Sequence, residues 1–256
     1  IQRSRGLGDV YKRQTLGFSD FAGSTLVHST GGAAALAGAI LLGARTGRFD
    51  KSGAAKPMKP FAASSIPLVT VGVFILWLGW FGFNGGSQLA MGTFDDAVAV
   101  SNIFINTNLA ACGGVLAAAV MTRLLAGKTD VVQMLNGAIG GLVAITAEPL
   151  APAPIAAIFI GAIGGIIVVF GTKLLFNFKI DDVVGAVPAH LFAGIWGTLA
   201  VPLTNSDANF SAQLIGVLSI NAFVFVVAYI VWAIMKNTMG IRSVSYTHLR
   251  AHETSG

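Results

Sequence analysis

The sequence predicts an all-α protein, a polytopic membrane bundle of seven transmembrane helices, and three observations lead to this fold class. Hydrophobic residues fill 54% of the 256 positions, charged residues only 11%, and the mean hydropathy is +0.75. A soluble domain carries about 25% charge, so too few charged side chains are present to cover a soluble surface. Seven long stretches lack Asp, Glu, Lys and Arg, and the basic residues between them fall in alternate connections.

The seven uncharged stretches are expected to be membrane-spanning helices. A bilayer core of roughly 30 Å needs about 20 apolar helical residues, and unpaired backbone amides are not tolerated in lipid. The alternative, the buried core of a large soluble protein, conflicts with the scarcity of charge. The fourth stretch is short and ends at Glu148-Pro149, where a helix should stop. The stretches are 21–44, 60–94, 97–122, 131–147, 149–172, 183–206 and 208–235.

The charges between the stretches predict the orientation of the chain. Four acidic residues and no basic residue occupy one set of connections: Asp95, Asp96, Glu148 and Asp207. The other connections and the end of the last stretch hold eleven basic residues: Arg45, Arg48, Lys51, Lys56, Lys59, Arg123, Lys128, Lys173, Lys179, Lys236 and Arg242. Cytoplasmic loops are enriched in Lys and Arg. We therefore expect a multi-pass protein of the cell (inner or plasma) membrane whose first span starts outside and whose C-terminus is cytoplasmic.

The two ends differ in composition from everything between them. Residues 1–14 and 243–256 are polar, and neither contains the apolar core of a signal peptide. We expect both to be foreign terminal sequence, of the kind that linkers contribute, with residues 15–242 forming the membrane domain. On that expectation the chain is an internal fragment. Nucleic-acid binding is not expected, because most of the small excess of positive charge lies in the first of these ends.

Two histidines lie within the predicted spans, where ionisable groups are expensive and indicate function. His28 stands eight residues after Asp20, and His190 stands eight residues after Asp182. Eight helical residues rise about 12 Å, which places both imidazoles near mid-membrane on spans of opposite direction, as in an inverted-repeat transporter. Two neutral imidazoles can share one hydrogen bond and relay a proton. The alternative is that each histidine only bonds a neighbouring helix, but the matched pair favours function.

The second stretch carries an aromatic and polar stripe. Trp80, Phe83 and Ser87 are spaced i, i+3 and i+7, so they share one helix face beside Asn84. Aromatic faces attract cations, and a serine hydroxyl accepts a hydrogen bond from an ammonium-type donor. With Ser87 nearest the outside, the order suits an outer cation site above an aromatic constriction. On spacing alone, an aromatic packing stripe is the favoured interpretation.

Other side chains are assigned structural roles. Asp20 opens the first span and Asp181 and Asp182 precede the sixth, where carboxylates can cap backbone N–H groups. Cys112, the only cysteine, forms no internal disulfide and is expected to pack among small residues. Glu148 is expected to be a loop residue. Clustered glycines inside the spans are expected to let helices approach closely: Gly31, Gly32, Gly137, Gly140, Gly141, Gly161, Gly164 and Gly165.

Three segments resemble the ammonium transporter (Amt) family. DFAGSTLVHSTGGAAALAGAILLGAR, from Asp20 to Arg45, is similar to a family signature throughout, and GWFGFNGGS (79–87) and IDDVVGAVPAHLFAGIWGTL (180–199) resemble its sixth and tenth helices. The similarity runs from about Leu16 to Arg242. It implies an eleven-helix protomer of two inverted five-helix repeats plus a last helix, assembled as a homotrimer with one pore per subunit, of which this chain supplies helices five to eleven.

The resemblance also implies roles for the site residues. His28 and His190 resemble the twin pore histidines, and Phe83 resembles one of two stacked gate phenylalanines. Ser87 resembles the serine of the external ammonium site, which favours Amt over the related Rh branch, and Trp80 lies on the same pore helix. The implied function is transport without a cofactor: NH4+ is recruited outside and NH3 passes the histidines with a proton relay. Asp20, Asn84 and Asp182 are assigned to the vestibule or to structure.

Departures from the family pattern leave alternatives open. Helices one to four, with the second gate phenylalanine and a tryptophan of the cation site, lie outside this sequence, as does the tail that couples the family to PII-type signal proteins. The chain alone is therefore expected to be transport-inactive. An ammonium sensor of the same family is the second alternative. An enzyme is not expected, because the sequence has no HExxH motif, no Ser/His/Asp set and no nucleotide loop, and two histidines make a poor metal site.

Overall fold

The computed structural model describes residues 17–49 and 63–242, and within them every predicted stretch is helical. The two predicted foreign ends, 1–14 and 243–256, lie outside the described residues. No strand element occurs in the part of the chain that is described. In chain order the elements are the π-helical turn η1 (Ser24–Ser29), α2 (Thr30–Leu42), α3 (Ile66–Gly86), α4 (Phe94–Ala126), α5 (Val131–Ile145), α6 (Pro154–Asn177), the π-helical turn η3 (Val187–Phe192), α7 (Ala193–Ala200), the 3-10 turn η4 (Val201–Leu203) and α8 (Phe210–Thr238).

Among the described residues, five helical segments are long and apolar enough to cross a membrane, namely 24–42, α3, α4, α6 and α8. The segments 131–145 and 187–203 are also apolar but shorter. Of the seven predicted spans, five therefore have the length of a full membrane-spanning helix. The α5 helix ends at Ile145, before Pro149, and its second half is surrounded by protein: every residue from Gly137 to Ile145 is buried.

Capping explains where two helices depart from the predicted limits. The side chain of Ser65 accepts a hydrogen bond from the Leu68 amide, which starts α3 later than the uncharged stretch does. Thr93 and Asp96 form a reciprocal capping box, so α4 begins within the acidic connection rather than after it. Asp95 and Asp96 therefore lie in the first turn of α4, where they also complement the helix dipole.

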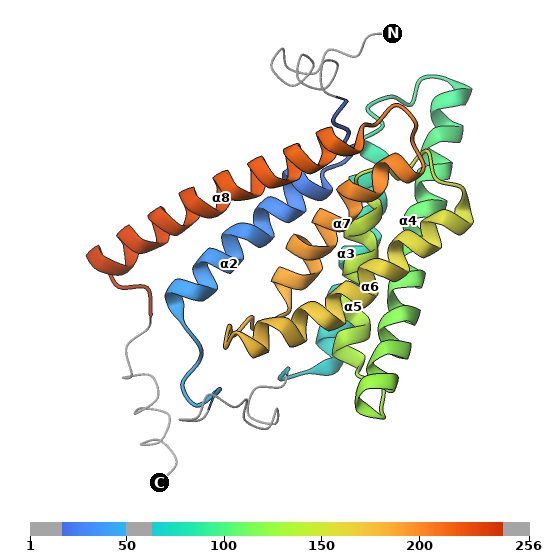
Figure 1. Cartoon of the computed structure of the whole chain (residues 1–256). Helices are drawn as coiled ribbons and strands as arrows, with labels where there is room; N and C mark the ends of the chain where they lie inside the picture. The colour runs from blue at the N-terminus through green and yellow to red at the C-terminus, as the bar shows by residue number, and fades with distance from the viewer. Residues whose placement is uncertain (1–16, 50–62, 243–256) are drawn as a thin grey trace.

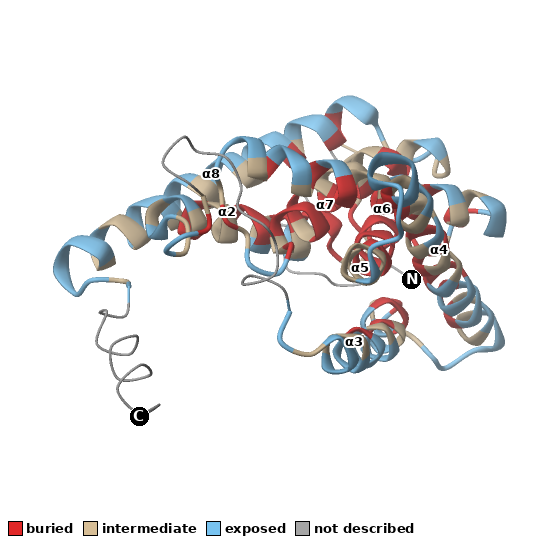
Figure 2. Cartoon of the chain, turned by 90° about the horizontal axis from the view of Figure 1, so that it is seen from below, coloured by how far each residue is buried: buried red, intermediate tan, exposed pale blue. Residues whose placement is uncertain are grey.

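The core lies where α5 packs between α4, α6 and α7, and most buried residues gather there (Figure 2). Glycines permit backbone contact at these crossings, as predicted. A side chain at Gly161 would collide with the carbonyl group of Ala110, and one at Gly165 would collide with that of Gly114. The α3 helix stands at the edge of this group in Figure 2, with most of its side chains exposed.

The two histidine-bearing elements cross each other directly. Gly32 in α2 packs on the backbone of Leu191, and Gly194 in α7 packs on Ser24 and Ser29, so neither position has room for a side chain. The hydroxyl groups of Thr25 and Thr198 are hydrogen-bonded at 2.6 Å at the same crossing. The α8 helix lies along α2 (Figure 1), which places the end of the described chain beside the end of α2.

Candidate functional site

The crossing brings the two predicted histidines together. The ring centroids of His28 and His190 lie 5.4 Å apart, and the ring planes differ by 24°. Each histidine occupies a π-helical turn, His28 in η1 and His190 in η3. Single π-helical turns inside helices are rare and occur often at functional sites. The crossing of these two turns therefore places the two imidazole rings side by side.

Both aspartates cap the turn that carries the histidine, as the sequence predicts. Asp20 Oδ2 accepts hydrogen bonds from the amides of Thr25 at 3.1 Å and Leu26 at 2.8 Å. The carboxylate of Asp182 accepts three amide hydrogen bonds, at 3.1, 3.0 and 2.7 Å from Gly185, Ala186 and Val187. A glycine with positive φ stands three residues after each aspartate, at Gly23 (φ 111°) and Gly185 (φ 77°), so the two turns are built alike.

Trp80 and Phe83 of the predicted stripe pack against His28. The Trp80 and His28 rings stack at 4.8 Å between centroids with a 16° angle between planes. Phe83 lies 5.4 Å from His28, tilted by 48°. Trp80 is buried, whereas Phe83 is partly exposed in this chain. The stripe is therefore part of a four-ring cluster with the histidines and not only a packing surface of α3.

Ser87 and Asn84 each form a hydrogen bond near the C-terminal end of α3. The Ser87 hydroxyl donates a hydrogen bond of 2.8 Å to the carbonyl oxygen of Phe83 at the end of α3, so its own oxygen is left to accept a donor. Asn84 is fully buried, and its Nδ2 donates to Thr107 Oγ1 at 3.0 Å, which ties α3 to α4. This contact fits the structural role assigned to Asn84.

One detail of the predicted histidine pair is different. The sequence suggested that the imidazoles share a hydrogen bond, but Nε2 of His28 is buried and has no hydrogen-bond partner among residues 17–49 and 63–242. The rings instead meet through near-parallel planes. The His28 ring is thus held by stacking on Trp80 and His190, and a bare polar nitrogen remains inside the cluster.

Sequence reasoning missed Thr146, which immediately follows α5. Its hydroxyl group is fully buried, donates to the Leu142 carbonyl at 2.7 Å and accepts from Trp80 Nε1 at 2.9 Å. The Thr146 carbonyl accepts the Ala22 amide at 3.0 Å. A threonine at a helix end has no distinctive sequence signal, so nothing in the pattern of residues could have singled it out.

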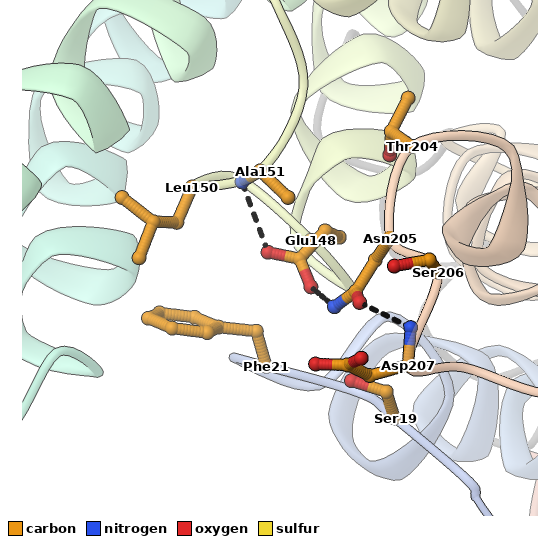
Figure 3. Close-up of a pocket in the computed structure, with 9 residues that line it drawn as sticks. All are labelled: Ser19, Phe21, Glu148, Leu150, Ala151, Thr204, Asn205, Ser206 and Asp207. Atoms are coloured by element: carbon orange, nitrogen blue, oxygen red, sulfur yellow. Dashed lines mark hydrogen bonds between the residues drawn. The ribbon is translucent and has the colours of Figure 1, made fainter.

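A polar cavity of about 580 Å³ opens on the side of the chain that carries the acidic connections. Glu148 lies in the loop after α5, as predicted, but it is buried: its carboxylate accepts from the Ala151 amide at 3.2 Å and from Asn205 Nδ2 at 2.7 Å (Figure 3). Glu148 therefore ties the connection after α5 to the connection before α8. Asp207 and Phe21 complete the wall beside it.

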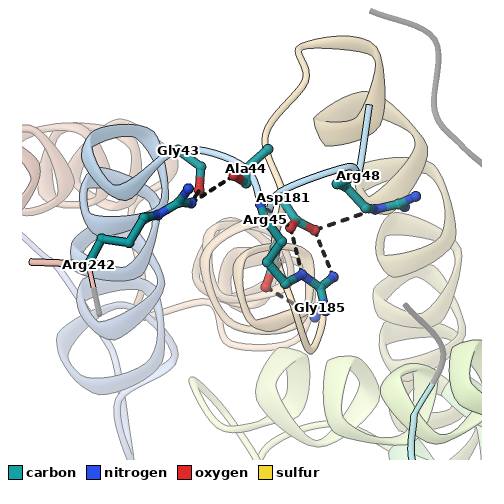
Figure 4. Close-up of polar contacts among 8 residues, drawn as sticks. Gly43, Ala44, Arg45, Arg48, Asp181, Gly185 and Arg242 are labelled. Carbon is teal, nitrogen blue, oxygen red and sulfur yellow. Dashed lines mark hydrogen bonds and ion pairs between the residues drawn. The ribbon is translucent and has the colours of Figure 1, made fainter. Parts of the chain in front are cut away.

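The sequence predicted that Asp181 caps the helix that follows it, and this prediction is wrong. At the opposite end of the crossing, Asp181 instead forms ion pairs with Arg45 and Arg48, a group that we call the ion-pair clasp. Arg45 donates to its carboxylate through Nε at 2.7 Å and Nη2 at 2.9 Å (Figure 4). Arg48 Nε lies 3.5 Å from the same carboxylate and its guanidinium group lies 4.5 Å from the centre of the Phe176 ring. Hydrogen bonding to Arg45 lowers the pKa of Asp181 and raises that of Arg45. Only Asp182 remains to cap the turn.

The end of α2 is held from a second side. Arg242 Nη2 donates to the carbonyl oxygens of Gly43 at 3.1 Å and Ala44 at 2.7 Å (Figure 4). Lys236 Nζ donates to the carbonyl oxygen of Leu41 at 2.7 Å. Cations at a helix C-terminus complement its dipole. Within the described residues, no group of three or more His, Cys, Asp or Glu side chains could hold a metal ion.

Fold and site together define a multi-pass helical membrane protein whose two crossing helices bring a pair of histidines together, one of which packs against aromatic rings. Residues 10–254 match the family model described as Ammonium Transporter Family. The chain belongs to the ammonium transporter family, whose members are membrane transport proteins rather than enzymes.

Relatives and solved structures agree with this assignment. The chain is 38% identical over 246 residues to ammonium transporter Amt2 of Archaeoglobus fulgidus, covering 88% of this chain and 51% of that protein. A solved Sensor Amt Protein superposes with a TM-score of 0.86 at 30% identity, covering 94% of this chain and 60% of that one. Candida albicans Mep2 gives a TM-score of 0.79 at 29% identity, covering 90% and 54%. The chain spans about half the length of the curated relatives it matches.

Proposed function

We propose that the complete protein moves ammonium across the cell membrane, recruiting NH4+ at an outer site of Ser87 and aromatic faces and conducting NH3 past His28 and His190. The observation that carries the proposal is the ring cluster, in which His28 packs against Trp80 and Phe83 on one part of its surface and against His190 on another. The family membership of the chain supports ammonium as the substrate.

The chemistry of the cluster supports binding a cation before releasing a neutral molecule. A cation over an aromatic face gains roughly 0.5–2 kcal/mol, depending on its solvation, and the Ser87 oxygen can accept a hydrogen bond from it. Moving a bare ion into a low-dielectric interior costs on the order of 20 kcal/mol in the idealised limit. Loss of a proton at this point removes most of that barrier.

The histidine pair would supply hydrogen-bonding groups for NH3 along an otherwise apolar path. A neutral imidazole offers one N–H donor and one bare nitrogen acceptor, and Nε2 of His28 has no hydrogen-bond partner among the described residues. With the rings 5.4 Å apart, a proton accepted by one imidazole can pass to the other through a bound molecule. Asp20 and Asp182 would hold the two turns that carry these rings.

The wider architecture is part of the same proposal. Asp20, Gly23, His28 and Gly32 each have a counterpart 162 positions later, at Asp182, Gly185, His190 and Gly194. The contact of Gly32 with Leu191 then corresponds to that of Gly194 with Ser29. This correspondence supports two inverted repeats, with residues 15–242 as the transporter segment. A homotrimer, a cytoplasmic C-terminus and a PII-type signal partner complete the arrangement proposed for the complete protein.

Replacing His190 by alanine in the complete protein tests the proposal. We expect the ammonium-evoked current of proteoliposomes to be abolished, because no second imidazole remains to carry the proton. Asn237→Ala, an exposed site on α8 whose amide bonds only its own helix, serves as the matched control and should conduct normally. A full current in the His190→Ala protein would rule out the relay.

An ammonium sensor is the second candidate, and the similarity to the solved Sensor Amt Protein favours it. A sensor would bind ammonium at the same ring cluster but carry no current. Calorimetric ammonium binding by wild-type protein whose proteoliposomes stay silent would support sensing over transport.

A further inference from the structure

The hydroxyl group of Thr146 is the hydrogen-bond acceptor for the Trp80 indole. The distance from Trp80 Nε1 to Thr146 Oγ1 is 2.9 Å, and both residues are buried. An indole N–H donates but cannot accept, so this bond satisfies the whole polar requirement of the Trp80 side chain. Thr146 in turn donates to the Leu142 carbonyl at 2.7 Å, which orients its lone pairs toward the indole.

The same short segment supports the turn that leads into His28. The carbonyl groups of Thr146 and Ala147 accept the amides of Ala22 at 3.0 Å and Phe21 at 2.7 Å. One turn earlier in α5, the Val143 carbonyl accepts the Ser24 hydroxyl at 2.6 Å. The end of α5 therefore contacts both partners of the Trp80–His28 stack, the indole through a side chain and the His28 turn through the backbone.

His28 depends on that stack for its position. Its buried Nε2 has no hydrogen-bond partner among the described residues, and its ring lies 4.8 Å from Trp80 at an angle of 16°. A rotation of the indole would consequently move or release the imidazole. Neighbouring apolar side chains confine the indole, and the Trp80–Thr146 hydrogen bond adds a directional contact that opposes such a rotation.

We propose that Thr146 is a positioning residue, which sets the plane of the Trp80 indole and through it the plane of the His28 imidazole. The inference rests on the proposed function for its transport consequence, but the positioning itself can be measured without transport. Thr146 does not touch the substrate path in this proposal; it acts only through Trp80.

Thr146→Val is the direct test, because valine keeps the shape of threonine and removes the acceptor. In the complete protein we expect the maximal ammonium flux to fall about tenfold, as for a small misplacement of a reacting group, with the half-saturating concentration nearly unchanged. Thr146→Ser retains the hydroxyl group and should restore the flux. Thr122→Val removes another buried hydroxyl that donates to an i−4 carbonyl, distant from the rings in sequence and contact, and is the matched control.

A spectroscopic readout separates positioning from general destabilisation. The indole ¹⁵N–¹H resonance of Trp80, assigned by its loss in Trp80→Phe, should move in Thr146→Val and stay in place in Thr146→Ser. Trp196 Nε1, which donates to the Ile160 carbonyl at 3.0 Å, provides an unchanged internal reference. If Thr146→Val does not assemble, Thr146→Ala and Thr146→Ser give the same comparison of absent and present hydroxyl group.

A double-variant cycle gives the decisive result. Because Thr146 acts through the indole, Thr146→Val should add no further loss of flux to Trp80→Phe. Additive losses, or an unmoved Trp80 resonance, overturn the positioning role. If wild-type protein carries no ammonium at all while the Trp80 resonance still moves in Thr146→Val, the proposed function fails and the positioning of the indole stands.

Discussion

Asp181→Asn tests whether the ion-pair clasp holds the ends of the two crossing helices together. The substitution keeps the size and hydrogen-bonding capacity of the side chain and removes its charge. Two arginines share that charge, Arg45 through hydrogen bonds of 2.7 and 2.9 Å and Arg48 at 3.5 Å. The side chains of Asp181 and Arg48 are each only 1% exposed, whereas that of Arg45 is 37% exposed.

The burial of Arg48 sets the size of the effect. Arg45 can turn into water when the carboxylate is lost, and an exposed ion pair contributes only about 1 kcal/mol or less. Arg48 cannot, so its buried guanidinium group loses the charge of this carboxylate without gaining contact with water. Breaking a buried pair on one side costs about 3–5 kcal/mol. At roughly 2–4 °C per kcal/mol for a chain of this size, the lower limit corresponds to an unfolding temperature lowered by about 6–12 °C.

Thermal unfolding of the detergent-solubilised protein, followed by tryptophan fluorescence at one fixed scan rate, measures this shift. Asp207→Asn makes the same chemical change at an exposed acid in the connection before α8 and should leave the unfolding temperature unchanged. Arg45→Met should fall between the two variants. If Asp181→Asn unfolds within about 2 °C of wild type, less than the shift for 1 kcal/mol, Arg48 does not depend on this carboxylate and the reasoning is refuted.

Two further predictions follow from the same crossing. The pKa of Asp181 lies below its ordinary value of 3.8. The stabilisation from the clasp is therefore complete above pH 3.8 and is lost as the pH falls through the lowered pKa. The gap in unfolding temperature between wild type and Asp181→Asn should stay constant from pH 7 to 5 and close only in stronger acid. Gly32→Ala should destabilise the protein by about 1–3 kcal/mol, because the added methyl group would overlap the Leu191 backbone. Gly31→Ala, with open space around the added carbon, should be neutral or slightly stabilising. Equal effects of the two variants in urea unfolding would contradict the crossing geometry.

The sequence predicted the parts of the site that depend on short spacing. An aspartate at the start of a helix caps amides within the next few residues, and both Asp20 and Asp182 do so. The i, i+3 spacing of Trp80 and Phe83 places both rings on one face, and both contact His28. The same local reasoning was wrong for Asp181, since a nearby guanidinium group competes for its carboxylate and only packing reveals that neighbour.

Composition and charge alone indicated that this protein lies in a membrane and where in the sequence its helices lie. Apolar length identifies a lipid-facing helix wherever backbone amides must be paired within the segment. The tertiary structure decided which polar groups meet. Trp80 and Thr146 are 66 residues apart, and Arg45 and Asp181 are 136 apart. Contacts over such separations depend on how whole helices cross, and that is set by backbone contacts such as Gly32 on Leu191 that no local pattern encodes.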